Sequence, residues 1–64
     1  MKKQEAIRPY DLTGGIIAYE QGELDEAEVR ELFQHLVDSG MAWTLQGSYG
    51  RTAAAMIEAG EIHA

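Results

Sequence analysis

The sequence predicts an all-α protein that folds as one compact three-helix domain. Its 64 residues suffice for a single domain and no more. Apolar residues recur at helical spacing in three segments, so that each segment would present one apolar face to the other two. A glycine follows each of these segments, as is common where an α-helix ends: Gly22, Gly40 and Gly60.

The first helix is expected over residues 12–21. Two consecutive glycines, Gly14 and Gly15, fall inside this segment, where each costs about 1 kcal/mol relative to alanine. The pair indicates either the close approach of another backbone or a helix that begins only after the glycines. The apolar face of this helix would consist of Leu12, Ile16 and Tyr19.

The second helix is expected over residues 26–39, and both of its ends carry sequence signals. Asp25 is placed to cap the first turn, and Glu28, three residues later, is placed to reach back in a capping box. Gly40 is expected to end the helix in the left-handed conformation, as in a Schellman motif. The apolar face would consist of Val29, Leu32, Phe33, Leu36 and Val37.

The third helix is expected over residues 49–59, with Ser48 as its N-terminal cap. The segment 41–47 before it has little β-branching, and it is interpreted as a loop or a single helical turn, with a short extended stretch as the alternative. Trp43 and Leu45 in this segment are expected to plug one end of the domain. The apolar face of the helix would consist of Tyr49, Ala53, Met56 and Ile57.

One hydrophobic core is expected between the helices, because each apolar face needs the other two for its burial. The sequence has no cysteine, so no disulfide can stabilise a domain of this size, and its net stability rests on this core. The predicted core residues are Leu12, Ile16, Tyr19, Leu24, Val29, Leu32, Phe33, Leu36, Val37, Leu45, Tyr49, Met56 and Ile57.

The charge is negative and unevenly distributed. Eleven Asp and Glu residues against five Lys and Arg residues give a net charge of −6. Residues 1–10 are expected to form a basic, frayed tail, and residues 11–64 the folded domain. Because an acidic surface repels phosphate groups, nucleic-acid binding is disfavoured. The acidic face is a candidate for docking on a basic partner, and its simpler interpretation is a surface that favours solubility.

The sequence shows neither a membrane-spanning segment nor a signal peptide. The longest uncharged stretch, residues 40–50, is too short and too polar to cross a bilayer, so no membrane partner is expected. The N-terminus lacks the apolar region of a signal peptide. We therefore expect a soluble, intracellular protein.

No catalytic motif is recognisable, and we expect neither an enzyme nor a cofactor or metal site. The Gly47–Arg51 segment at a helix start could hold an anion through backbone N–H groups, the helix dipole and Arg51. The simpler interpretation of that segment is a tight turn with a capping serine. His35 lies between Glu31 and Asp38 on one helix face, a spacing compatible with a weak metal site but more typical of a solvated face.

Residue types that are common at protein–protein interfaces cluster in one short segment. Trp43 is the only tryptophan in the sequence, and it would serve either as part of the core or as an interface anchor. The candidate partner-binding residues are Trp43, Gln46, Tyr49 and Arg51.

A second candidate interface lies on the side of the third helix opposite its apolar face. Small residues there would let two helices approach closely. A two-fold axis between Ala54 and Ala55 would set Ala54 against Ala55 of the partner subunit and, twice, Arg51 against Glu58 of the partner subunit. The alternative is a solvent-exposed face that is rich in alanine for its helix propensity. The candidate homodimer interface is Arg51, Ala54, Ala55 and Glu58.

Distinctive strings are spread over most of the chain, from about residue 11 to residue 62. They are Leu12–Thr13, Ile16–Glu20, Gly22–Leu24, Leu32–Asp38, Ala42–Trp43, Leu45–Gly47, Tyr49–Arg51 and Ala53–Ala54. Together they resemble a family of short, uncharacterised proteins encoded by tailed bacteriophages. The resemblance implies a phage origin and a setting in the cytoplasm of the bacterial host. Because no activity is established for that family, it implies no catalytic residue.

The predicted function is therefore that of a small phage-encoded, non-enzymatic interaction protein that binds and modulates a host protein. One alternative is a small anion- or ligand-binding module that uses the turn at residues 47–51. Another is a virion or structural accessory protein. Capture of binding partners from a host lysate distinguishes the three, because each predicts a different co-purifying species.

Overall fold

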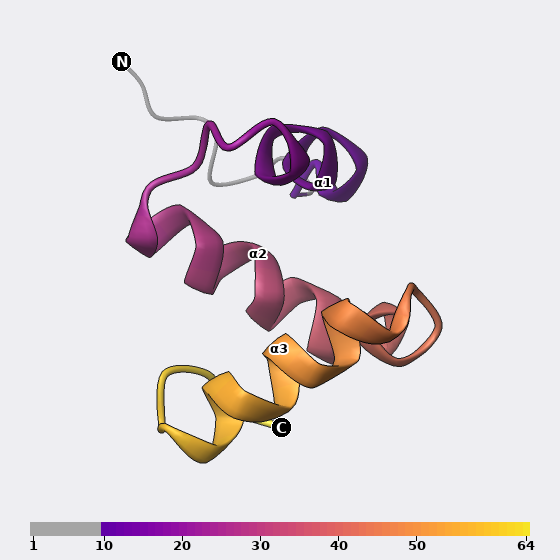
Figure 1. The fold of residues 1–64 in the computed structure, drawn as a ribbon, viewed down its shortest axis with the longest axis vertical. Helices are drawn as coiled ribbons and strands as arrows, with labels where there is room; N and C mark the ends of the chain where they lie inside the picture. The colour runs from indigo at the N-terminus through magenta and orange to yellow at the C-terminus, as the bar shows by residue number, and fades with distance from the viewer. Residues whose placement is uncertain (1–9) are drawn as a thin grey trace.

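The computed structural model describes residues 10–64 and shows three α-helices with one 3-10 helix between the second and the third (Figure 1). In Figure 1, α2 runs between α1 and α3 and forms the centre of the domain. The predicted all-α three-helix domain is confirmed. The elements are α1 (Leu12–Glu20), α2 (Glu26–Ser39), the 3-10 helix η2 (Met41–Trp43) and α3 (Gly47–Glu58).

The ends of α1 and α2 follow from local side-chain chemistry. The Asp11 carboxylate accepts a hydrogen bond from the Gly14 N–H at 3.0 Å and so caps α1. The capping box of α2 is present as predicted: the Asp25 side chain accepts from the Glu28 N–H at 2.8 Å, and the Glu28 side chain accepts from the Asp25 N–H at 3.0 Å. The bounds of α2 agree with the prediction, and α1 ends one residue earlier than expected.

A serine completes the C-terminal end of α2. Gly40 has φ 82°, and its N–H donates to the Val37 carbonyl at 3.0 Å, as in a Schellman motif. The second bond of that motif is relayed by the Ser39 hydroxyl, which accepts from the Met41 N–H at 3.4 Å and donates to the Leu36 carbonyl at 3.2 Å. The chain therefore reverses within two residues and leads directly into η2.

The start of α3 differs from the prediction. The helix begins at Gly47 rather than at residue 49, so Ser48 lies inside the first turn and is not the cap. Gln46 occupies the cap position without a side-chain hydrogen bond, and its carbonyl already accepts from the Tyr49 N–H at 2.9 Å. The backbone that leaves η2 places the helix start two residues early, and this geometry outweighs the preference of serine for the cap.

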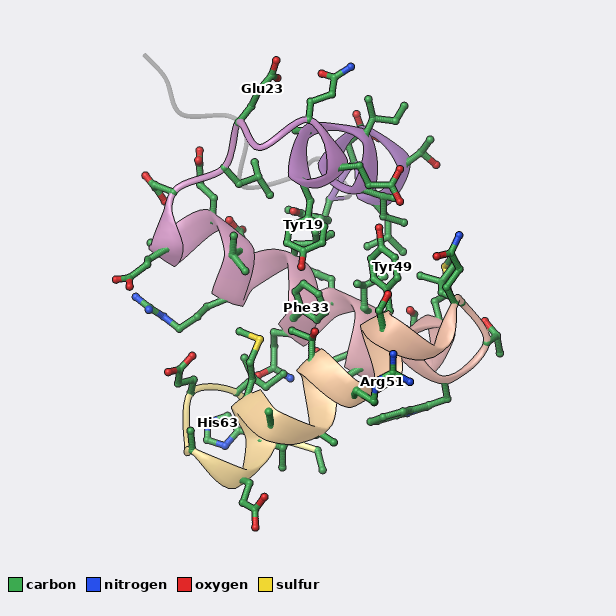
Figure 2. All side chains as sticks on the ribbon, in the orientation of Figure 1. Tyr19, Glu23, Phe33, Tyr49, Arg51 and His63 are labelled. Atoms are coloured by element: carbon green, nitrogen blue, oxygen red, sulfur yellow. The ribbon has the colours of Figure 1, made fainter. Side chains whose placement is uncertain are left out.

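Aromatic side chains join α1 to the other two helices (Figure 2). The Tyr19 ring contacts Phe33 of α2 edge-on, with ring centroids 5.3 Å apart, and lies 5.8 Å from the Tyr49 ring of α3. A Cβ atom at Gly15 would lie 3.1 Å from Cδ1 of Leu32, so this glycine lets α1 approach α2 closely. The neighbours of Gly15 are side chains of Tyr10 and Leu32, so the predicted close approach of another backbone is not found there. The alternative of a helix that starts after the two glycines is also wrong, because α1 begins at Leu12.

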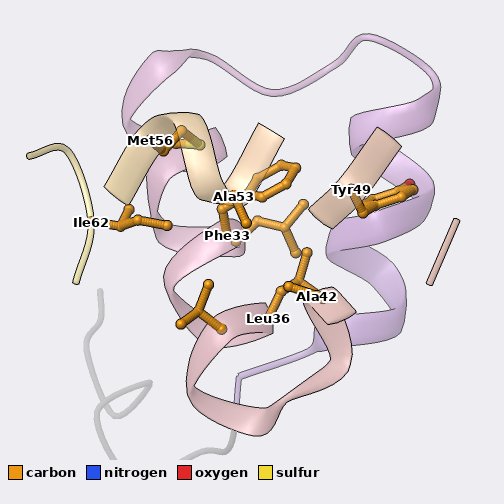
Figure 3. Close-up of a cluster of buried hydrophobic side chains, with 9 residues drawn as sticks. Phe33, Leu36, Ala42, Tyr49, Ala53, Met56 and Ile62 are labelled. Atoms are coloured by element: carbon orange, nitrogen blue, oxygen red, sulfur yellow. The ribbon is translucent and has the colours of Figure 1, made fainter. Parts of the chain in front are cut away.

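The core lies between α2 and α3 (Figure 3). All of the predicted core residues are buried there or pack against its edge, and those of α1 are only half-buried. Ala53, which belongs to the predicted apolar face of the third helix, is also buried, and so are Ala42 and Ile62, which are not among the predicted core residues. The buried residues are Leu32, Phe33, Leu36, Val37, Ala42, Tyr49, Ala53, Met56 and Ile62.

The residues after α3 fold back onto α2 and complete the core. Gly60 has φ 78° and turns the chain, and Ile62 is then only 3% exposed. The Gln34 side chain on α2 holds the next residue by its backbone: Nε2 donates to the His63 carbonyl at 2.9 Å, and Oε1 accepts from the His63 N–H at 2.8 Å. This pair of hydrogen bonds fixes a segment that has no helix of its own.

Trp43 does not plug the end of the domain. Its side chain is 53% exposed, while its neighbour Ala42 is fully buried. In a 3-10 helix, consecutive side chains point about 120° apart, so the turn that places Ala42 in the core directs Trp43 outward. The expectation of a buried tryptophan is therefore wrong, and Leu45 is half-buried at the core edge.

Nearly all of the predicted basic tail, residues 1–9, lies outside the described residues. Tyr10, which had been assigned to that tail, belongs to the folded domain. Its ring stacks on the His35 ring of α2 with centroids 4.0 Å apart and planes 9° apart. The ring contact therefore ties Tyr10 to α2.

Candidate partner-binding surface

The exposed Trp43 is held on a rigid support. One face of the indole rests on α3, since a Cβ atom at Gly50 would lie 3.7 Å from Cε3 of Trp43. The turn that carries Trp43 is closed by three hydrogen bonds to the Met41 carbonyl. The Thr44 N–H donates at 3.0 Å, the Thr44 hydroxyl at 3.1 Å and the Leu45 N–H at 3.1 Å. The tryptophan therefore presents apolar area to solvent without much freedom to move.

Two further predicted binding residues are close to this tryptophan in the sequence, and one of them, Arg51, directly follows Gly50. Gln46 and Arg51 are both exposed. The Arg51 side chain runs back along α3, because its Nη1 atom lies 3.1 Å from the position of a Cβ atom at Gly47. We refer to the exposed side chains of Trp43, Gln46 and Arg51 as the Trp43 surface.

Tyr49, the fourth predicted binding residue, is not available to a partner. It is 6% exposed, and its ring stacks on Phe33 with centroids 5.9 Å apart. Its hydroxyl donates to the Glu20 carboxylate at 2.6 Å. Burial, together with this hydrogen bond and the negative charge of Glu20, raises the pKa of Tyr49 to about 12. Its role is to tie α3 to the end of α1, so its assignment to the partner-binding set is corrected.

The charges divide the molecule into two regions. Between residues 10 and 38 the chain carries eight Asp and Glu residues and a single Arg, whereas residues 39–57 contain no acid and only Arg51 as a charged residue. Figure 2 shows Glu23 beyond α1, on the side of the domain away from Arg51. The Trp43 surface therefore lies on a stretch of the chain that contains no acidic residue, in a protein with a net charge of −6.

Two other candidate sites from the sequence are the anion site at the start of α3 and the metal site at His35. In the N-terminal turn of α3 the Tyr49 N–H is bonded to the Gln46 carbonyl, so this donor is not free for an anion. His35 stacks on Tyr10, and the pKa of Tyr10 is raised by burial and by the nearby carboxylate of Glu31. Within residues 10–64, no group of three His, Asp or Glu side chains is placed to hold a metal ion.

The outer face of α3 is open to solvent. All four residues predicted for a homodimer lie exposed on it: Arg51, Ala54, Ala55 and Glu58. A shallow groove runs beside them, lined by Arg51, Thr52, Ala55, Met56, Ala59 and Glu61. None of the helices in the described part of the chain has the length and apolar character needed to cross a membrane.

The fold and this surface define a small all-α domain that carries an exposed aromatic residue on a segment without acidic residues. A family model described as "Domain of unknown function (DUF7417)" matches residues 7–64. The chain belongs to this family. Comparisons with curated proteins and with solved structures gave no match.

Proposed function

We propose that the chain is a small, non-enzymatic interaction protein that binds another protein through the Trp43 surface. The observation that carries this proposal is the exposure of Trp43. It is the only tryptophan of the sequence, and 53% of it faces solvent on a turn that is fixed by hydrogen bonds. Small domains need their large apolar side chains for the core, so the exposure of one of them supports a role in binding.

The energetics favour an anchor role for this tryptophan. About half of a tryptophan side chain corresponds to roughly 120 Å² of apolar surface, and its burial by a partner would contribute about 3 kcal/mol. Little of this is lost to ordering, because Gly50 already supports one face of the ring. Tryptophan and arginine are also the residue types that most often dominate binding energy at interfaces.

The charge distribution indicates which partner surface would fit. Arg51 is the only charged residue between Asp38 and Glu58, so a partner with an apolar pocket beside a carboxylate is complementary to it. The acidic α1–α2 side is the competing interface, and it would require a basic partner. Charge reversal at Glu26 and Glu31, compared with Arg51→Ala, separates the two interfaces.

The identity of the partner is proposed from the sequence. The resemblance to phage-encoded proteins supports a protein of the bacterial host as the partner, with modulation of that protein in the host cytoplasm as the role. The anion-binding alternative is supported by the position of the Arg51 guanidinium near the start of α3. A virion accessory role would require capsid or tail proteins as partners.

The test compares two exposed apolar residues. Wild type, Trp43→Ala and Ile17→Ala are used as bait in a host lysate, since Ile17 is similarly exposed at 52% but lies on α1. We expect one stoichiometric host protein with wild type and Ile17→Ala, and its loss with Trp43→Ala. Titration with the purified partner should shift the fluorescence of Trp43 to shorter wavelength, because the indole leaves water.

Several outcomes would contradict the proposal. Retention of the partner by Trp43→Ala together with its loss by Ile17→Ala would place the interface on α1. Loss after charge reversal at Glu26 and Glu31, with no effect of Arg51→Ala, would place it on the acidic face. A co-purifying small anion, or capsid and tail proteins, would support the two alternative functions instead.

A further inference from the structure

The outer face of α3 carries two opposite charges in a symmetric arrangement. At about 100° per residue, Arg51 and Glu58 lie within about 20° of each other around the helix, on the side opposite the buried Ala53. They are seven residues apart, which is about 10.5 Å along the axis. Ala54 and Ala55 lie halfway between them and are exposed, so the middle of this face has no large side chain.

We propose that this face binds a second copy of the chain, with two α3 helices packed antiparallel about a two-fold axis between Ala54 and Ala55. The axis brings Arg51 of each copy to the level of Glu58 of the partner subunit, so the same ion pair forms twice by symmetry. Arg51 has no acidic residue between itself and Glu58 on its own helix. The charges of this face are therefore complementary to the same face of a second copy.

The alanines determine how close the two helices come. Small side chains at the centre of a helix–helix contact allow the backbones to approach, and the longer Arg51 and Glu58 then reach across on either side of the axis. The shallow groove beside Ala55 continues this surface toward Ala59. The contact can thus extend beyond a single line of residues.

The available area predicts a weak, reversible dimer. α3 has 12 residues and is about 18 Å long, so one of its faces offers roughly half of the ~800 Å² per partner that a stable interface buries. Exposed ion pairs add little affinity and mainly set the register. We therefore expect a dissociation constant on the order of 10–100 μM.

The dimer would also affect binding through the Trp43 surface, and this consequence rests on the proposed function. In an antiparallel pair about a two-fold axis, the same flank of each helix lies on the same side of the dimer. Trp43 rests against the Gly50 flank of α3, so both copies of Trp43 would face one side. A dimer would then present two Trp43 side chains to a partner and gain avidity, while Arg51 pairs with Glu58 of the partner subunit.

The test is a charge swap measured by sedimentation equilibrium from 5 to about 500 μM, over the range where weak association is detectable. Arg51→Glu and Glu58→Arg should each weaken the dimer about tenfold, because each places like charges together twice. The double swap Arg51→Glu/Glu58→Arg should restore wild-type association, since it rebuilds both pairs in reverse. Ala54→Glu should abolish association by blocking the close approach.

The controls distinguish loss of the specific ion pairs from a change in net charge and from loss of folding. Glu23→Arg makes the same charge change as Glu58→Arg on an exposed residue away from α3, and it should leave the dimer intact. Trp43→Ala should also leave it intact, so failure of the proposed function and failure of the dimer are distinguishable. Circular dichroism checks that each surface variant folds. A wild type that stays monomeric at all concentrations, or a double swap as weak as the single variants, would overturn the proposal.

Discussion

The segment after α3 offers a sharp test of how the core is completed. Ile62→Ala removes three carbon atoms from a side chain that is only 3% exposed. At about 0.8 kcal/mol per buried methylene, the loss of transfer free energy is ~2.4 kcal/mol, and the residual cavity adds to it. Because this segment can relax more easily than a helix, we expect a total cost of about 2–3 kcal/mol. For a domain of this size, the corresponding fall in Tm is about 10–20 °C.

The hydrogen bonds of Gln34 belong to the same unit. Gln34→Ala removes both bonds to the His63 backbone, at an expected cost of about 1 kcal/mol because water can replace them. If these bonds and Ile62 hold one segment, the double variant should be less destabilised than the sum of the single variants, by at least ~0.5 kcal/mol. Amide exchange at His63 should also become fast in Gln34→Ala.

The assay is urea unfolding followed by circular dichroism, with Ile17→Ala as the matched control. This control removes the same atoms from an isoleucine that is 52% exposed, so its cost should stay below about 0.5 kcal/mol. Equal effects of Ile62→Ala and Ile17→Ala would refute the packing of the segment. Strict additivity of Gln34→Ala and Ile62→Ala would show that the hydrogen bonds and the buried side chain act independently.

The remaining predictions test the centre of the core, the two helix contacts and the buried phenol. Leu36→Ala should cost about 2–5 kcal/mol, because Leu36 has no exposed surface, and a nearly unchanged melt would contradict this. Gly50→Ala should raise Tm, because its Cβ would make ordinary contacts of 3.5 Å and 3.7 Å and alanine favours the helix by about 1 kcal/mol. Gly15→Ala should instead lower Tm, since its Cβ would lie 3.1 Å from Leu32. The pKa of Tyr49 is about 12 in the folded chain against 10.0 for the free group. The protonated phenol therefore stabilises the fold fully below pH 10, and this stabilisation is lost between pH 10 and about 12. Urea unfolding at increasing pH should show a smaller loss of stability in Tyr49→Phe than in wild type.

The parts of the fold that could be predicted from the sequence depend on residues close together in the chain. Asp25 and Glu28 form their capping box within one turn, and Gly40 adopts its positive φ regardless of what packs nearby. The bounds of α2 could therefore be read directly. The apolar face of α2 was also predictable, because helical spacing alone assigns Leu32 and Leu36 to one side.

The parts that could not be predicted depend on contacts between distant residues. Ile62 lies between Glu61 and His63, so no apolar periodicity marks it, and it is buried only because the turn at Gly60 brings it to the core. The Gln34 clamp joins residues 29 positions apart. The start of α3 was misplaced for a related reason, since the turn at Met41 sets the backbone that enters the helix. A signal existed for Tyr49, whose position on an apolar helix face already favoured burial over partner binding.

The candidate site depends on one geometric choice in the turn between α2 and α3. The relay through Ser39 and the left-handed Gly40 bring the chain round so that one residue of η2 enters the core, and Ala42 is that residue. Rotating the turn by one position would place Trp43 in the core instead of Ala42, and an indole would have to displace the close-packed side chains there. The small side chain of Ala42 fits this core, so the indole is left outside. The fold therefore keeps Trp43 on the surface without a cost to the core, and this is what would allow Trp43 to act as the proposed anchor.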